Sequence, residues 1–197
     1  SAGTPSGGLP VPAKGFAMIV ANLATYPPRL GSLMKTIERL CPQVDRINVV
    51  LNQYQEVPLA IQKNAKICAM IPEEDTKDTG KFLPDVSDAS WVFLCDDDIH
   101  YPNTYVVDSI KTMTAIDEPN FVGGYHGSIY RSARLRKWSV GGWRGYLKER
   151  RRPLGAVRDR IGIHQECPLP VVVDQLGTGV MVLRAHQMPP FDYVKSA

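Results

Sequence analysis

The sequence has no hydrophobic run long enough to cross a membrane as a helix. Its longest, mostly apolar runs cover residues 16–21, 47–51 and 171–173, whereas a membrane span needs about 18 to 20 apolar residues. It also has no Cys-x-x-Cys pair among its four cysteines, which argues against zinc ribbons and thioredoxin-like redox motifs. Free thiols are then expected, and with them a reducing, cytoplasmic compartment.

Neither sign of charge dominates the chain as a whole. Its 197 residues include 23 Lys and Arg against 20 Asp and Glu, a net charge of +3, so composition alone does not indicate a nucleic-acid-binding protein. The distribution is uneven, because residues 131–160 hold 11 of the basic residues and only two acidic ones. Several Gly and Pro residues in this segment predict a long mobile loop.

The basic segment 131–160 combines arginines with Trp and Tyr side chains. This composition suits an anionic glycan or lipid-linked acceptor, peripheral contact with an anionic membrane surface, or single-stranded nucleic acid. A solvated loop is the alternative. Because the segment lies between the acidic triplet at 96–98 and the Leu-Gly-Thr-Gly stretch at 176–179, we expect it to act as a lid on the acceptor side.

Apolar runs rich in Val and Ile alternate with amphipathic or turn-rich stretches, which is typical of a single α/β domain. Residues 1–15 are expected to be a flexible linker that precedes a domain at 16–197. Strands are predicted at 15–22, 45–52, 66–71, 91–95 and 121–130, and on both sides of a glycine turn within 171–183. Helices are predicted at 30–40 and 104–116, with a short helical turn or loop at 57–64.

An acidic triplet, Asp96, Asp97 and Asp98, follows the apolar strand predicted at 91–95. Ligands of open α/β sheets bind beyond the carboxyl ends of the strands. Because alternate residues of an extended chain point the same way, Asp96 and Asp98 are expected to converge on one Mg²⁺ or Mn²⁺, with Asp97 directed elsewhere. A solvated turn with an Asp helix cap is the alternative.

These motifs together resemble the bacterial GT-A glycosyltransferases, the nucleotide-diphospho-sugar transferases that build surface polysaccharides. The resemblance rests on segments that occur in order at 21–52, 56–58, 78–82, 91–102 and 175–183. It implies a GT-A, Rossmann-like sandwich with a mostly parallel central sheet. It also implies metal-dependent transfer of a sugar from a nucleotide-diphosphate donor, for which we expect a UDP-sugar, to a carbohydrate or lipid-linked acceptor in polysaccharide synthesis.

The resemblance also assigns roles to residues near the donor. It implies that Asp96 to Asp98 form a DXD motif that holds Mn²⁺ or Mg²⁺ on the donor diphosphate. It places Ala24, Thr25, Tyr26 and Arg29 at the nucleotide. On physical grounds Arg29 faces a phosphate or lies on the surface, and Tyr26 stacks on a base or packs against the protein.

A second donor-side motif is Asp78-Thr79-Gly80-Lys81-Phe82. It offers a turn glycine and a cation ahead of the acidic triplet, which suits Asp78 and Lys81 to the approach of a phosphate. A surface turn with a solvated Lys is the alternative.

Sugar transfer with inversion also needs a base for the acceptor hydroxyl. Asp174 and His186 are our candidates, together with three residues of equally indecisive spacing: His126, His164 and Glu166. The resemblance implies that the base follows residues 180–183 by a loop and a helix. We therefore expect efficient transfer to need further C-terminal sequence or a partner subunit.

Two rival functions remain open at this stage. A sugar nucleotidyltransferase normally has a glycine-rich phosphate loop after its first strand, where this chain has residues 24–29, Ala-Thr-Tyr-Pro-Pro-Arg. A nucleic-acid or glycan binding module built on residues 131–160 has no need of an acidic triplet, and we consider nucleic acid the less favoured partner.

Overall fold

The computed structural model describes residues 17–116, 118, 120–131, 157–165, 167 and 169–196. The expected linker at 1–15 and most of the basic segment 131–160 lie outside the described residues, as does Glu166. Within the described part of the chain no helix is long and apolar enough to cross a membrane.

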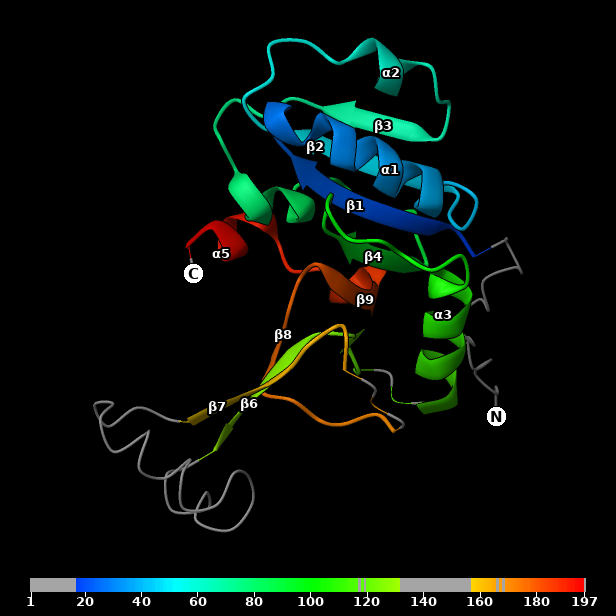
Figure 1. Cartoon of the computed structure of the whole chain (residues 1–197), viewed down its shortest axis with the longest axis vertical. Helices are drawn as coiled ribbons and strands as arrows, with labels where there is room; N and C mark the ends of the chain where they lie inside the picture. Colours follow the sequence, from blue (N-terminus) through cyan, green and yellow to red (C-terminus); the bar gives the residue numbers. More distant parts are fainter. Residues whose placement is uncertain are drawn as a thin grey trace, which may run out of the picture.

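A six-stranded sheet in the order β3-β2-β1-β4-β9-β5 forms the centre of the molecule (Figure 1). Strands β1 (Ile19–Thr25), β2 (Arg46–Leu51), β3 (Ile67–Met70) and β4 (Trp91–Cys95) are parallel. Strand β9 (Val180–Arg184) runs antiparallel to β4, and β5 (Gly123–Gly124) runs antiparallel to β9. This confirms the predicted α/β class and the mostly parallel sheet, which is compatible with a Rossmann-like arrangement.

Helices and short 3-10 turns connect these strands. They are η1 (Pro27–Arg29), α1 (Leu30–Leu40), α2 (Leu59–Gln62), η2 (Lys77–Phe82), α3 (Tyr105–Ile116), η4 (Ala185–Gln187) and α5 (Phe191–Ser196). Helix α1 begins after Pro27 and Pro28, since proline suits the first turn of a helix, and it ends just before Pro42. Its buried side chains Leu33, Ile37 and Leu40 recur at helical spacing and face the sheet.

Both faces of the central strands are covered. Alternate residues of β1 and β4, such as Leu23 and Phe93, pack with α1 and α3 in the larger core. The intervening residues Val20, Val92 and Leu94 pack in a smaller core on the other face, together with Phe82 of η2. Burial on both faces explains why β1 and β4 are nearly continuous apolar runs in the sequence.

The strand order changes direction between β1 and β4. The chain passes from β1 through α1 to β2 and then to β3, and it returns to place β4 on the opposite side of β1. Leu23 is therefore paired with Val49 on one side and with Cys95 on the other. Such a switch point opens a crevice at the carboxyl ends of the two strands, where open α/β sheets bind their ligands.

A second, antiparallel sheet in the order β7-β6-β8 lies beside the first (Figure 1). It contains β6 (Gly127–Arg131), β7 (Val157–Ile161) and β8 (Gln175–Leu176). The prediction of a single strand at 121–130 is therefore wrong. This stretch forms β5 in one sheet and β6 in the other, with Tyr125 and His126 between them. Local alternation of apolar residues predicts extended chain, but it does not say with which partner that chain pairs.

Candidate functional site

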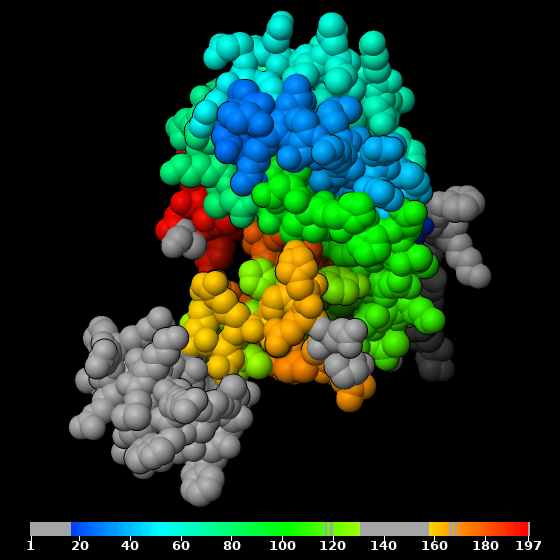
Figure 2. Space-filling model, in the orientation of Figure 1, coloured from blue at the N-terminus to red at the C-terminus, as the bar shows by residue number. Residues whose placement is uncertain are grey.

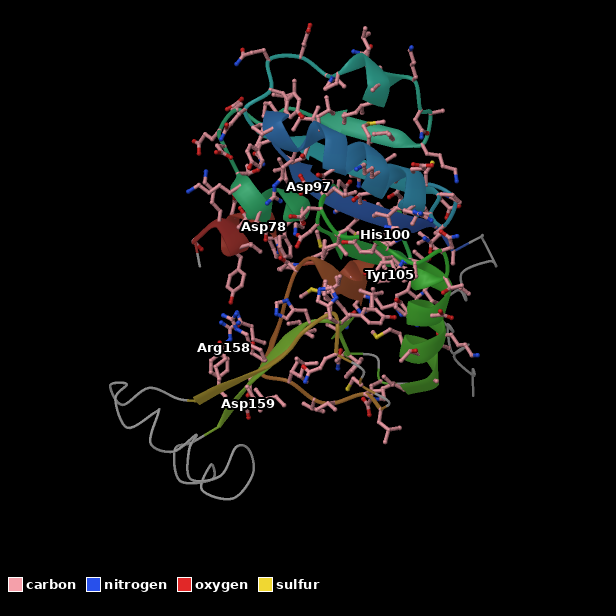
Figure 3. All side chains as sticks on the ribbon, viewed as in Figure 1. Asp78, Asp97, His100, Tyr105, Arg158 and Asp159 are labelled. Atoms are coloured by element: carbon pink, nitrogen blue, oxygen red, sulfur yellow. The ribbon has the colours of Figure 1, made fainter. Side chains whose placement is uncertain are left out.

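A cavity of about 280 Å³ opens at the carboxyl ends of β1 and β2, next to the end of β4. Its lining comes from the loops after these strands and from η2 and the loop before it. The lining residues are Ala24, Thr25, Tyr26, Arg29, Asn52, Gln53, Asp75, Lys77, Asp78 and Asp97. Six of the ten are residues that the sequence predicted at a donor site. Figure 3 labels Asp78 and Asp97, which lie at the same edge of the sheet.

Asp97 ties the end of β4 to the loop after β1. Its carboxylate accepts hydrogen bonds from the Thr25 hydroxyl at 2.6 Å and from Nη1 of Arg29 at 2.8 Å. The side chain of Asp97 is 2% exposed. Its hydrogen bond and charge raise the pKa of the Arg29 guanidinium, which therefore stays charged. Asp97 thus positions the loop that lines the cavity, and both of its oxygens are engaged within the protein.

The other two acidic side chains do not share a partner. Nη1 of Arg29 also lies 3.2 Å from Asp98, whereas the carboxylate of Asp96 pairs with Lys81. Arg29 is thus the cation that Asp97 and Asp98 share. Asp96 and Asp98 were predicted to point at one cation, but in this structure they pair with different ones. The triplet has left the regular strand, which ends at Cys95, so the alternation of an extended chain no longer applies.

Lys81 is a buried cation between two carboxylates. Its side chain is 0% exposed, and its ammonium contacts Asp96 and lies 2.7 Å from Asp78. Burial alone would lower the pKa of Lys81, but the charges of Asp96 and Asp78 outweigh burial and raise it. The alternative of a solvated surface Lys is therefore wrong, and the residue keeps a fixed positive charge beside the acidic triplet.

Two buried asparagines hold the backbone at Lys81. Asn48 of β2 donates to the side-chain oxygen of Asn22 at 2.8 Å, and Asn22 of β1 donates to the carbonyl of Lys81 at 2.9 Å. Both side chains are at most 3% exposed, so these hydrogen bonds satisfy groups that would be costly to bury alone. We did not predict this pair, although a polar residue inside each of two apolar strands was a usable signal.

The turn Gly177-Thr178-Gly179 forms the other side of Asp96. The amide of Asp96 donates to the carbonyl of Gly179 at 3.1 Å, which extends the pairing of β4 with β9. Tyr101 reinforces the contact, since its hydroxyl accepts from the Asp96 amide at 2.8 Å and donates to the Gly179 carbonyl at 2.5 Å. A Cβ on Gly179 would overlap the Asp96 carboxylate, so only glycine permits this close approach.

The outer rim of the cavity is fixed by strained backbone. Gln53 and Lys77 have φ of 61° and 49°, and they are the non-glycine residues with positive φ in the described part of the chain. Asn52 holds the rim together, because its side-chain oxygen accepts from the Thr76 amide at 2.8 Å and its amide donates to the Lys77 carbonyl at 3.0 Å. Backbone strain of this kind concentrates at functional sites.

The candidates for a catalytic base are dispersed. His186 lies in η4 after Arg184, which pairs with Trp91 at the start of β4, so His186 is at the opposite end of the sheet from the triplet. Asp174 accepts from the Tyr130 amide at 2.6 Å in the second sheet, and His164 is exposed in a turn. Glu166 is outside the described residues. The fold therefore does not bring Asp174 and His186 together at Asp96.

His126 is the base candidate that adjoins the turn beside Asp96. Its carbonyl accepts from the Gly177 amide at 2.8 Å. Its Nδ1 lies 2.7 Å from the position that a Cβ on Gly177 would occupy. One side of the turn thus contacts His126 and the other contacts Asp96.

The carboxylates fit a hard divalent cation that is shared with a ligand. Among the described residues no group of three or more His, Cys, Asp or Glu side chains is arranged to hold a metal ion. Mg²⁺ in particular is commonly held by one or two carboxylates plus substrate phosphates rather than by a protein cage. Asp96 and Asp98, at 35% and 46% exposed, supply accessible oxygen donors of that kind.

Comparison with known protein families finds no family model that matches this chain. Comparison with curated proteins finds no matching sequence.

Proposed function

We propose that this domain is a metal-dependent glycosyltransferase that binds a nucleotide-diphospho-sugar in the crevice between β1 and β4. The observation that carries the proposal is the 280 Å³ cavity at the switch point of the sheet, bordered by both cations and carboxylates. Cations attract a diphosphate, and carboxylates suit the metal that neutralises it. The alternation of β strands and helices supports a GT-A-like sandwich, which is the fold implied by the resemblance.

Each part of the donor has a suitable partner in the crevice. Tyr26 is 39% exposed beside Arg29, whose guanidinium carbon lies 5.6 Å from the centre of the tyrosine ring, so the pair offers a flat surface for a base. Arg29 lines the cavity and provides fixed positive charge for the diphosphate, and the buried Lys81 holds Asp96 in place beside it. Asp96 and Asp98 would hold Mn²⁺ or Mg²⁺, which stabilises the departing diphosphate when it is bound.

His126 is the side chain that we propose as the proton acceptor for the attacking hydroxyl. It replaces Asp174 and His186 in this role because it adjoins the turn that contacts Asp96. The proposed site of action is the cytoplasm, at the inner membrane surface. The acceptor is a glycan or a lipid-linked glycan.

Calorimetric titration with nucleoside diphosphates tests the proposal. UDP, GDP, ADP and CDP, and the corresponding triphosphates, are titrated into the full chain with Mn²⁺ and with a chelator. We expect one diphosphate to bind only with Mn²⁺, and Asp98→Asn to weaken this binding at least tenfold because an amide lacks the charge that a hard cation needs.

Glu38→Gln is the matched control, since it removes one negative charge from an exposed position on α1 and should leave affinity unchanged. Binding that is equal with Mn²⁺ and with the chelator would contradict the proposed metal site. Failure of all four diphosphates would contradict the donor site, and a marked preference for a triphosphate would favour a nucleotidyltransferase.

A further inference from the structure

A second cavity, of about 630 Å³, lies between α3 and the segment at 169–173. In Figure 2 this segment appears in orange between the yellow atoms of β7 and the green atoms of α3. Cavities of about 300 to 1,000 Å³ are typical of sites for small molecules. The lining of this cavity includes Met113, Phe121 and Leu176.

The lining is uncharged. None of the described residues around this cavity is Asp, Glu, Lys or Arg, although such residues make up 22% of the chain. A sugar or phosphate buried there would lose hydrogen bonds to water that the lining replaces poorly, which is costly. A hydrocarbon chain has no such requirement and gains free energy from leaving water.

The apolar side chains at this cavity are unusually exposed. Of the eleven large hydrophobic side chains exposed in the described part of the chain, five line this one cavity. They are Tyr125, Ile163, Leu169, Val171 and Val172. Grouped apolar exposure marks interaction sites in soluble proteins, whereas single exposed side chains carry no such meaning.

The turn at 177–179 connects the apolar cavity with the acidic triplet. His126 lines the cavity and contacts the turn at Gly177. The same turn contacts Asp96 through Gly179. A molecule whose tail occupies the cavity can therefore extend a polar head past His126 toward the acidic triplet.

We propose that this cavity binds the hydrocarbon chain of a lipid-linked acceptor and so presents the acceptor hydroxyl at the donor crevice. The inference rests on the proposed function and narrows its acceptor to the lipid-linked class. A concave, uncharged site next to the turn at 177–179 suits a single hydrocarbon chain, and it would place the head group of that lipid near His126.

Alkyl glucosides below their micelle-forming concentrations provide the probe. Methyl, hexyl and octyl β-glucoside are titrated into the full chain. Affinity should increase by about threefold to fourfold for each methylene that the cavity buries, which is the ratio expected from hydrocarbon transfer. Methyl glucoside, which has no chain, should bind weakest.

Leu169→Asp and Leu59→Asp form a matched pair of variants. Both leucines are 72% exposed, so neither change should unfold the protein, but Leu169 lines the cavity and Leu59 lies on α2. Leu169→Asp should weaken octyl glucoside binding at least tenfold, and Leu59→Asp should leave it unchanged. Both variants should keep the wild-type affinity for the nucleoside diphosphate with Mn²⁺.

Three results would overturn the inference. The first is an affinity that does not depend on chain length or on Leu169. The second is a wild-type chain that binds no glucoside but self-associates in sedimentation, with the self-association lost in Leu169→Asp. This would indicate that the cavity lies at a face between two copies of the chain. The third is a wild-type chain that binds no glucoside but floats with neutral phosphatidylcholine vesicles, with flotation lost in Leu169→Asp. This would indicate that the apolar side chains insert into a bilayer. Glucoside binding without any diphosphate binding would instead contradict the proposed donor function, and with it the acceptor role of the cavity.

Discussion

Tyr101 connects two distant parts of the chain through one hydroxyl group. The hydroxyl bridges the Asp96 amide and the Gly179 carbonyl, and the ring packs against Tyr105 with centroids 4.8 Å apart. Burial raises the pKa of this phenol well above its ordinary value, with smaller contributions from Cys95 and Tyr105. The phenol therefore stays protonated in the folded protein under conditions in which an exposed tyrosine ionises.

Tyr101→Phe should lower the free energy of unfolding by about 1–2 kcal/mol at pH 7, because it removes a buried hydrogen-bonded group. Above about pH 10 the unfolded wild type loses the Tyr101 proton and the folded protein keeps it. Wild-type stability then falls by about 1.4 kcal/mol more per pH unit than that of the variant. Urea unfolding from pH 7 to 11.5 should show the two curves converging.

Tyr193→Phe is the control for this series, because Tyr193 is 70% exposed. Its stability should follow the wild type at every pH. A constant gap between wild type and Tyr101→Phe across the alkaline range would show that the Tyr101 phenol is not shielded as the structure indicates.

Residue types and spacing predicted part of the site. Thr25, Arg29 and Asp97 were expected near the donor and do line one cavity. The burial of Lys81 was not predictable, because it depends on Asn22 in a strand 59 residues earlier. The ion-pair partners of Asp96 and Asp98 were not predictable either, because Arg29 and Lys81 lie in two separate segments, η1 and η2.

Elements were predicted better than their pairing. The helix expected at 30–40 has those bounds, and the strand expected at 91–95 is β4. Both have strong local periodicity or a continuous apolar run between turn residues. Val171 and Val172 were expected in a strand, yet they lie outside β8 and line the second cavity, because apolar β-branched residues favour extended chain without specifying a partner strand.

Gly179→Ala tests the close approach of the turn before β9 to the end of β4. The added methyl group would overlap the Asp96 carboxylate, so either the turn or the carboxylate must move. We expect a loss of about 1–3 kcal/mol of stability, as in other overpacked sites, and at least tenfold weaker binding of the nucleoside diphosphate with Mn²⁺. Thermal unfolding and calorimetry measure the two effects.

Gly31→Ala provides the opposite case on α1. Nothing lies within 4 Å of the position that its Cβ would occupy, so alanine should stabilise the helix by about 0.4–1 kcal/mol. Diphosphate affinity should not change. If Gly179→Ala behaved like Gly31→Ala, the turn would not be held against Asp96.

Over the whole molecule, burial differs sharply between the two sheets. None of the fully buried apolar side chains in the described part of the chain comes from β6, β7 or β8, whereas β1, β2 and β4 contribute many. Regions with few buried apolar contacts open at lower free energy than the global core. We expect amides of β6 and β7 to exchange hydrogen for deuterium at least tenfold faster than those of β1 and β4.

Mass spectrometry of exchanged peptides measures this difference. Octyl glucoside should slow exchange near Gly127 and in β8, which border the second cavity. Nucleoside diphosphate with Mn²⁺ should slow exchange in the loops after β1 and β4 instead. Equal exchange rates in the two sheets would show that they unfold as one cooperative unit.

The pairing of β4 with β9 sets an order of events on the ribosome. All five residues of β4 are buried in the finished protein, and one edge of that strand is paired by β9, which starts about 85 residues later. At synthesis rates of about 5–20 residues per second, the nascent chain waits about 4–17 seconds for its partner strand. During that interval the edge of β4 that β9 will cover is open to other chains, so a chaperone that binds this stretch would protect the nascent protein from mispairing.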